Sequence, residues 1–314
     1  MMTFSVRPYH PGDEESLVAL WNACLPRDLI APTVFQAKVL LDPNFDPLGL
    51  LLAQEGKQTI GFLLALARRY PLFSAGLEEQ HGWITAFAVH PAHRRQGVGR
   101  ALLTAGLQYL RARGRKLAWF SPYAPGYFTP GLDAAAYPDG LAFLQTQGFV
   151  TAYQALSMER SLADFCYPPE ATAAEERLVS EGIVIRPYQP NDLWPLLAFT
   201  AQFFGGDWER FLRQALGHIV DGEWPGDVVW VARESEEIVG YCQHTGERFG
   251  PFGVREDYRG RGIGLVLLCR CLERMKGKGH HNAWFLWAGE RAAHLYARVG
   301  FHEARRFHIM KRET

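Results

Sequence analysis

Two glycine-rich segments carry residues whose types and spacing suit the binding of a phosphate group. Glycine lets the backbone approach an anion closely, the amides and dipole at a helix start favour negative charge, and arginine adds paired donors. Each segment reads Arg-x-x-Gly-x-Gly and lies between an expected strand and an expected helix: Arg94-Arg95-Gln96-Gly97-Val98-Gly99 and Arg259-Gly260-Arg261-Gly262-Ile263-Gly264. The pattern therefore predicts two anion sites, one in each half of the chain.

The two glycine segments are corresponding parts of an internal repeat. Residues 7–13 and 186–192 share five of seven residues at an offset of 179, which also relates Gly61 to Gly240. The offset falls to 165 at the glycine segments and then to 152 at the pairs Gly148-Phe149 and Gly300-Phe301. The chain is therefore predicted to be a duplication whose first copy carries two insertions, of 14 residues before its glycine segment and 13 residues after it.

Each copy is expected to contain both strands and helices. The order is a strand, a helical region, antiparallel strands, the glycine segment, a helix, a strand, a helix and a final strand. The predicted fold class is α/β (α+β), with two domains that are each a mixed, mostly antiparallel twisted sheet flanked by helices. The expected boundaries are 1–165 for the first domain, 166–181 for a linker rich in Pro, Ala and Glu, part of which is compatible with a short helix, and 182–314 for the second domain.

Composition argues against several other classes of protein. The 33 Lys and Arg residues balance the 33 Asp and Glu residues, whereas a nucleic-acid-binding protein usually has a basic excess. The longest apolar run, 48–53, is too short to span a membrane, and the N-terminus lacks the pattern of a secretory signal. The five cysteines and the histidines are not spaced as metal ligands. We therefore expect a cytoplasmic protein without metal, nucleic-acid or membrane partners; the oligomeric state is open, and a monomer with an internal pseudo-dimer is one possibility.

Three stretches, 87–103, 254–268 and 292–301, resemble the GCN5-related N-acetyltransferase (GNAT) family. The first two are similar to its core motif, and the third to its last helix running into its final strand. The resemblance implies that acetyl-CoA is a co-substrate and lies between two splayed parallel strands. Its pyrophosphate would contact Arg94, Arg95, Gln96, Gly97, Val98, Gly99 and Arg100 in one copy and Arg259, Gly260, Arg261, Gly262, Ile263 and Gly264 in the other. Its pantetheine and acetyl group would pair with the strand backbone at Ala88, Val89, Gly253 and Val254.

The same resemblance implies an N-acetyltransferase, in which a primary amine of a small molecule or protein attacks the thioester directly. Tyr296, five residues before Phe301, takes the position that often supplies the general acid, whereas the first copy has Leu144 there. The second copy is therefore predicted to be catalytic, although Tyr296 is alternatively a packed aromatic residue. Glu247 is a candidate general base, or a solvated carboxylate at a strand end.

The segment 121–140, within which the second insertion falls, contains four prolines and four aromatic residues and is expected to pack as an ordered loop. Tyr123, Tyr127, Phe128 and Tyr137 line an acceptor pocket, cover the cofactor, or belong to a structural surface loop. One of these tyrosines is also a candidate for the general acid that the first copy lacks at Leu144.

Two other functions remain open from the sequence. One is a non-catalytic acyl-CoA-binding or regulatory protein that retains both loops but has lost the chemistry. The other is transfer of a longer acyl group, or transfer to a different nucleophile, because the loop recognises CoA and not the acyl group. The identity of the acceptor is not encoded in these motifs, since a fold does not specify a substrate.

Overall fold

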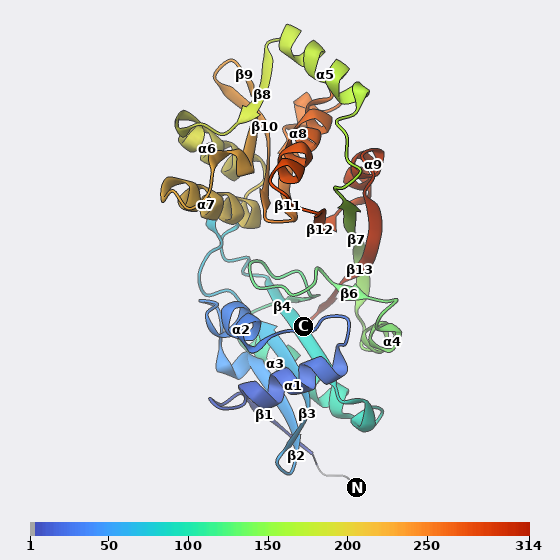
Figure 1. Cartoon of the computed structure of the whole chain (residues 1–314). Coiled ribbons are helices and arrows are strands. Elements are labelled where there is room, and N and C mark those ends of the chain that lie inside the picture. The colour runs from blue at the N-terminus through green and yellow to red at the C-terminus, as the bar shows by residue number, and fades with distance from the viewer. Residues whose placement is uncertain (1–3) are drawn as a thin grey trace. The chain divides into compact units, whose positions relative to one another are not determined.

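The computed structural model describes residues 4–314 and divides into two compact units. The first unit contains the chain up to Pro71, Gly76–Ala155 and Arg306–Thr314. The second unit contains Leu72–Ala75 and Leu156–Arg305. Figure 1 labels the elements of both.

The first unit is a sheet with helices on both faces. Its strand order is β1-β2-β3-β4-β5-β13, in which only the β4–β5 pair is parallel. The strands are β1 (Ser5–Pro8), β2 (Leu50–Glu55), β3 (Gln58–Leu66), β4 (His81–Val89), β5 (Leu117–Phe120) and β13 (His302–Glu313), with the short β6 (Leu132–Asp133) also on β13.

Alternate strand residues of the first unit build two separate cores, as expected for side chains with a period of two. Leu50, Leu52 and Phe62 pack with α1 (Glu14–Cys24) and α2 (Pro32–Phe35), which continues into a π-helical turn over Gln36–Leu40. Leu51 and Leu63 pack on the other face with α3 (Val98–Ala112) and α4 (Pro138–Thr146).

The second unit repeats this plan with the strand order β8-β9-β10-β11-β12-β7. Its strands are β8 (Ile183–Pro187), β9 (Val229–Glu234), β10 (Glu237–Thr245), β11 (Arg248–Val254), β12 (Asn282–Ala288) and part of β7 (Val150–Ser161). One core lies under α6 (Leu193–Phe203) and α7 (Gly206–Val220). The other lies under α5 (Pro169–Ser180), α8 (Ile263–Gly277) and α9 (Glu290–Arg298).

The duplication predicted from the sequence is visible element by element. The bounds of β2 and β9, and of β3 and β10, differ by 179 residues. Those of α3 and α8 differ by 165, and those of α4 and α9 by 152. The insertions therefore fall between β3 and β4 and between β5 and α4, where the sequence offsets changed.

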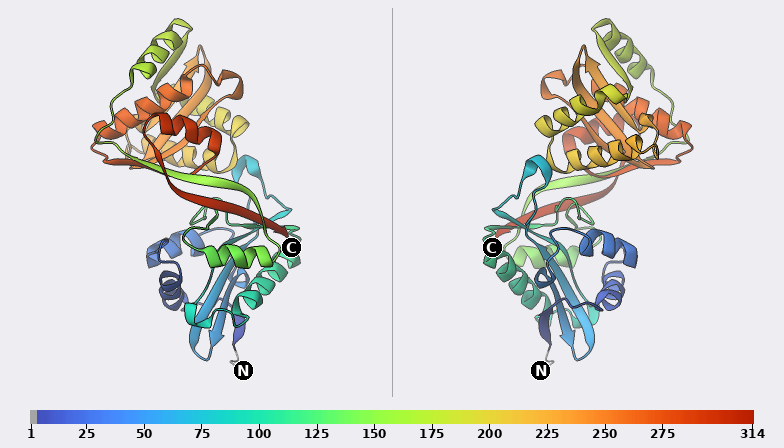
Figure 2. Two further views of the ribbon diagram at one scale, coloured as in Figure 1. Left: turned by 90° about the vertical axis from the view of Figure 1, so that its right-hand side faces the viewer. Right: turned by 90° about the vertical axis from the view of Figure 1, so that its left-hand side faces the viewer.

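The last strand of each copy continues without a turn from one unit into the other, so that each of these strands contributes residues to both units. β7 and β13 are each 12 residues long and neighbour each other; they are the long green and red strands of Figure 2. Residues 156–161 of β7 pair with β12, and residues 310–313 of β13 pair with β5. The units are therefore interleaved in sequence, unlike the consecutive domains 1–165 and 182–314 that we expected.

The expected linker 166–181 is mostly the helix α5 and belongs to the second unit. Three of its side chains, Ala171, Ala174 and Leu178, are buried in that unit's core. The alanines that suggested a linker are the small residues that allow this helix to pack closely.

Candidate functional site

Both units contain a fork where two parallel strands diverge. β4 and β5 are paired from His81↔Leu117 to Ile84↔Phe120, after which β4 continues to Val89 without β5. In the second unit β11 and β12 are paired at Arg248↔Trp284 only. Beyond these pairs, β4 and β11 have no neighbouring strand on that edge among the described residues, directly before each glycine loop.

A β-bulge marks the fork of the first unit. Ala65 pairs with Ile84 and Leu64 pairs with Ala86, so Thr85 is the extra residue on β4. The Thr85 side chain is 5% exposed and its Oγ1 has no hydrogen-bond partner within residues 4–314. A buried hydroxyl without a partner is costly in a folded protein and calls for an explanation. We missed this residue in the sequence, although it is the one polar side chain in the run Trp83–Val89.

The first glycine loop is accessible, and two of its arginines have no acidic partner among the described residues. Gly97 has φ +86° and caps α3 without any side-chain hydrogen bond, and a Cβ added there would meet nothing within 4 Å. Arg94 donates its Nε to the carbonyl of Val89 at 3.1 Å. Arg95 and Arg100 are exposed and form no ion pair in the described chain. The loop therefore offers free helix-start amides and two unpaired guanidinium groups to an anion.

The second glycine loop has the same backbone but different surroundings. Gly262 has φ +96° and caps α8, and Arg259 donates its Nε to Val254 at 3.3 Å, as Arg94 does to Val89. Arg261 instead donates to a carboxylate oxygen of Glu181 at 2.7 Å. The Arg261 carbonyl accepts from Arg177 of α5, also at 2.7 Å. This loop is therefore in contact with α5, while its first-unit counterpart is free.

Tyr296 of α9 lies beside the fork of the second unit. Its ring centroid is 6.0 Å from that of Phe252 on β11 and 4.4 Å from that of Phe285 on β12. Burial raises the pKa of its phenol well above the usual value, so the group stays protonated and able to donate. Its role as an acid stays a prediction. The corresponding Leu144 of α4 is buried and apolar.

Glu247 lies in the turn before β11, at the paired end of β11 and β12. Its Oε1 accepts hydrogen bonds from the backbone N–H groups of His281 at 2.9 Å and Asn282 at 3.0 Å. These bonds lower the pKa of the carboxyl group. The carboxylate thus joins two chain segments; its proposed role as a base stays a prediction.

The aromatic residues of the segment 121–140 contact α1, the connection between α1 and α2, and the π-helical turn after α2. Phe128 packs on Trp21 with ring centroids 4.5 Å apart, the carbonyl of Tyr127 accepts from Lys38 at 2.7 Å, and the Tyr137 hydroxyl donates to Asp28 at 2.7 Å. The insertion is therefore an ordered loop, as expected.

Tyr123 differs from the other three because it is completely buried. Its hydroxyl donates to Asp42 at 3.0 Å and accepts from Asn44 at 2.9 Å, and its ring lies 5.3 Å from that of Trp83 on β4. Burial raises the pKa of both the Tyr123 phenol and the Asp42 carboxyl. This residue belongs to a buried polar network, and a role of these aromatics in acceptor binding stays a prediction.

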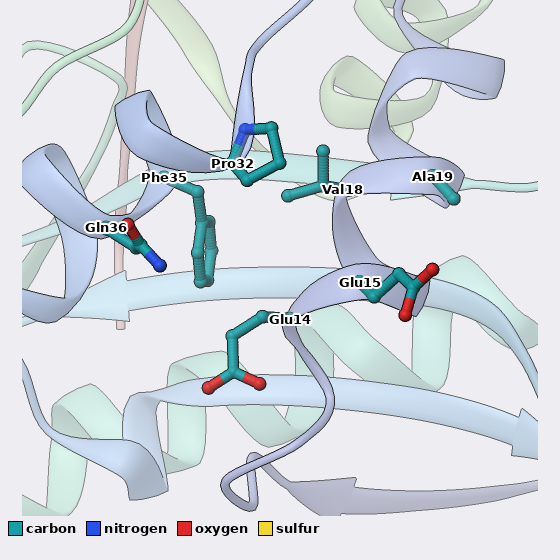
Figure 3. A pocket seen from close by; sticks show the side chains of 7 residues that line it. All are labelled: Glu14, Glu15, Val18, Ala19, Pro32, Phe35 and Gln36. Carbon is teal, nitrogen blue, oxygen red and sulfur yellow. The ribbon is translucent and has the colours of Figure 1, made fainter.

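A pocket of about 370 Å³ lies between α1 and α2 (Figure 3). Its lining is Glu14, Glu15, Val18, Ala19, Pro32, Phe35 and Gln36. None of the residues that the sequence singled out lines it. Within residues 4–314 no cluster of three or more His, Cys, Asp or Glu side chains is arranged to hold a metal. None of the helices in that range has the length and apolar character to cross a bilayer.

The fold and the two loops at strand forks define a class of protein. Residues 14–124 match the acetyltransferase (GNAT) family model, and residues 225–303 match an acetyltransferase (GNAT) domain model. The chain belongs to the GNAT family, in a tandem form with one such domain in each half.

Relatives with the same layout include the mycothiol acetyltransferase of Clavibacter sepedonicus, which is 25% identical over 94% of this chain and 90% of its own length. A solved fungal structure, described as a GCN5-related glucosamine N-acetyltransferase region of a multidomain β-N-acetylglucosaminidase, matches 99% of this chain with a TM-score of 0.80 and 19% identity. The match covers 38% of that longer chain. A tandem GNAT protein from the clavulanic acid biosynthesis pathway matches 99% of this chain and 98% of its own, with a TM-score of 0.61 and 15% identity.

Proposed function

We propose that the chain is an acetyl-CoA-dependent N-acetyltransferase that transfers an acetyl group to a primary amine. The observation that carries the proposal is the first glycine loop, where an open helix N-terminus adjoins Arg95 and Arg100, which have no acidic partner within residues 4–314. The names of the relatives, which refer to mycothiol and glucosamine, favour a small polar acceptor over a protein.

The residues of the first unit fit the parts of such a co-substrate. The amides of residues 95–100, with Arg95 and Arg100, would bind its pyrophosphate. The free edge of β4 from Thr85 to Val89 would pair with the pantetheine arm. At the fork, the unpartnered hydroxyl of Thr85 would donate a hydrogen bond to a reacting oxygen or sulfur atom.

Acetyl-CoA supplies a thioester whose carbonyl carbon the neutral amine attacks. The new N–C bond forms as the C–S bond breaks, the nitrogen loses one proton, and the departing thiolate gains one. Catalysis then depends on orientation and on hydrogen bonds to the developing charge. In the alternative hypothesis the same reaction takes place in the second unit, where Tyr296 donates that proton and Glu247 acts as the base.

The test is release of the CoA thiol from acetyl-CoA, followed with a thiol reagent, across a panel of amines that includes amino sugars and amino acids. We expect release that depends on both the acceptor and acetyl-CoA. Acetyl-CoA binding without acceptor-dependent release from any amine would favour the alternative, a non-catalytic acyl-CoA-binding protein.

A further inference from the structure

We infer that the second unit's nucleotide loop is closed by the chain's own helix α5, so that acyl-CoA binds at one site per chain, in the first unit. The inference rests on the proposed function for the identity of the ligand. The shared motif predicts that both loops bind the ligand, whereas the surroundings of the two loops differ.

Helix α5 fills the space in front of the second loop. Arg177 of α5 donates to the carbonyl of Arg261, and a Cβ added at Gly262 would lie 3.1 Å from both the Cβ of Ala174 and the Nη2 of Arg177. The equivalent Gly97 meets nothing within 4 Å. A phosphate that approached the second loop on the side of Gly262 that faces Ala174 and Arg177 would therefore meet α5.

Carboxylates already neutralise the arginines of the second loop. Glu181 holds Arg261 at 2.7 Å, with Glu234 3.7 Å from the same side chain. Glu256 lies 3.2 Å from Arg259. An incoming pyrophosphate would have to displace these acids or bear their repulsion, which lowers its affinity for this loop relative to the first.

The two arginines of the first loop that have no acidic partner, and the threonine at the first fork, are replaced by other residue types in the second unit. At the offset of 165 residues, Arg95 corresponds to Gly260 and Arg100 to Leu265. Thr85 at the first fork corresponds to Gly250. Two cations and one hydroxyl are thus present in one copy only.

On the α6–α7 side of the second unit, aromatic rings lie against β11. Phe204 and Trp208 stack with ring centroids 4.5 Å apart and an interplanar angle of 15°. A Cβ added at Gly253 of β11 would lie 2.8 Å from Trp208 and closer still to Phe204. At the offset of 179 these residues correspond to Leu25 and Leu29, and Leu29 is 66% exposed. At these two positions the first unit therefore has no aromatic ring next to the corresponding strand.

Packing holds α5 in its closing position. Ala171, Ala174 and Leu178 are buried in the same core as α8. Glu175 accepts two hydrogen bonds from Arg270 of α8, at 3.0 and 2.7 Å. The closure is thus part of the folded second unit and not a surface contact of one side chain.

Calorimetric titration of the full chain with acetyl-CoA tests the inference through its stoichiometry. Arg94 and Arg259 form a matched pair, because each donates its Nε to the carbonyl of the last residue of the preceding strand. We expect one site per chain, with Arg94→Ala weakening binding about tenfold, as loss of a charge-assisted contact implies, and Arg259→Ala changing it less than about twofold. Circular dichroism and thermal melts would confirm that both variants fold.

Two sites per chain, or one site that weakens with Arg259→Ala and not with Arg94→Ala, would overturn the inference. A third result has a different meaning. If acetyl-CoA does not bind at all to a folded chain, the proposed function fails together with the inference, whereas two sites would leave the proposed function standing.

Discussion

Replacing Thr85 by valine is expected to make the protein more stable and less active. Valine keeps the shape of the side chain and removes a hydroxyl that is buried at the fork without a hydrogen-bond partner. Relief of an unpaired buried hydroxyl is worth about 1–3 kcal/mol. Since each kcal/mol shifts Tm by about 2–4 °C in a domain of 150–250 residues, Tm should rise by several degrees.

The same change should lower kcat about tenfold or more, because one hydrogen bond to the transition state contributes about 1.4 kcal/mol or more. Acetyl-CoA affinity should change little if the loop and the arginines provide most of the binding. The measurements are a thermal melt of the free protein and thiol release at saturating acetyl-CoA.

Thr200→Val is the matched control, because Thr200 is also buried but its hydroxyl donates to the carbonyl of Leu196 at 2.8 Å. It should lose about 1 kcal/mol of stability without affecting kcat. The reasoning is refuted if Thr85→Val lowers Tm as Thr200→Val does, or if it leaves kcat unchanged.

Three further predictions follow from the geometry. Arg95→Ala with Arg100→Ala should raise the KM for acetyl-CoA at least tenfold at low salt, and the effect should shrink near 1 M salt, where charges are screened within about 3 Å; a salt-independent loss would show that these side chains are not paired with phosphates. Tyr296→Phe should leave kcat within about twofold if transfer is confined to the first unit, whereas a larger fall would place the chemistry in the second unit, as the sequence suggested. Asp192 is fully buried between Arg186 and Arg233, each 2.6 Å away, and although burial opposes its ionisation, hydrogen bonds from these partners and from the N–H of Gln189 lower its pKa. Its stabilisation is therefore fully present above the usual pKa and is lost as pH falls from that value through the lowered one. Asp192→Asn should cost about 3 kcal/mol at pH 7, because Arg186 loses its carboxylate partner and Arg233 keeps only the exposed Glu236, and urea unfolding from pH 3 to 7 would measure this loss.

The sequence alone determined the duplication, its insertions and the two glycine loops. These features are local, because a left-handed glycine before a helix and an apolar stripe every third or fourth residue specify a loop and a helix wherever they occur. The spacing of the copies also gave the correspondence between elements, since helices and strands that share an offset occupy equivalent places. The divergence of the parallel strands, implied by the family resemblance, is present in both units.

Only the tertiary structure decided which loop is open and what surrounds each candidate residue. The closure of the second loop depends on Ala174, about 90 residues away in the chain, and no pattern near Gly262 reports that contact. The partnerless state of Thr85 and the complete burial of Tyr123 depend likewise on side chains from several elements. The pairing of β7 with β12 and of β13 with β5 also depends on strands that are distant in the chain. Local sequence specifies backbone conformation, whereas exposure, hydrogen-bond partners and strand partners are set by segments distant in the chain, and these decide whether a motif can bind its ligand.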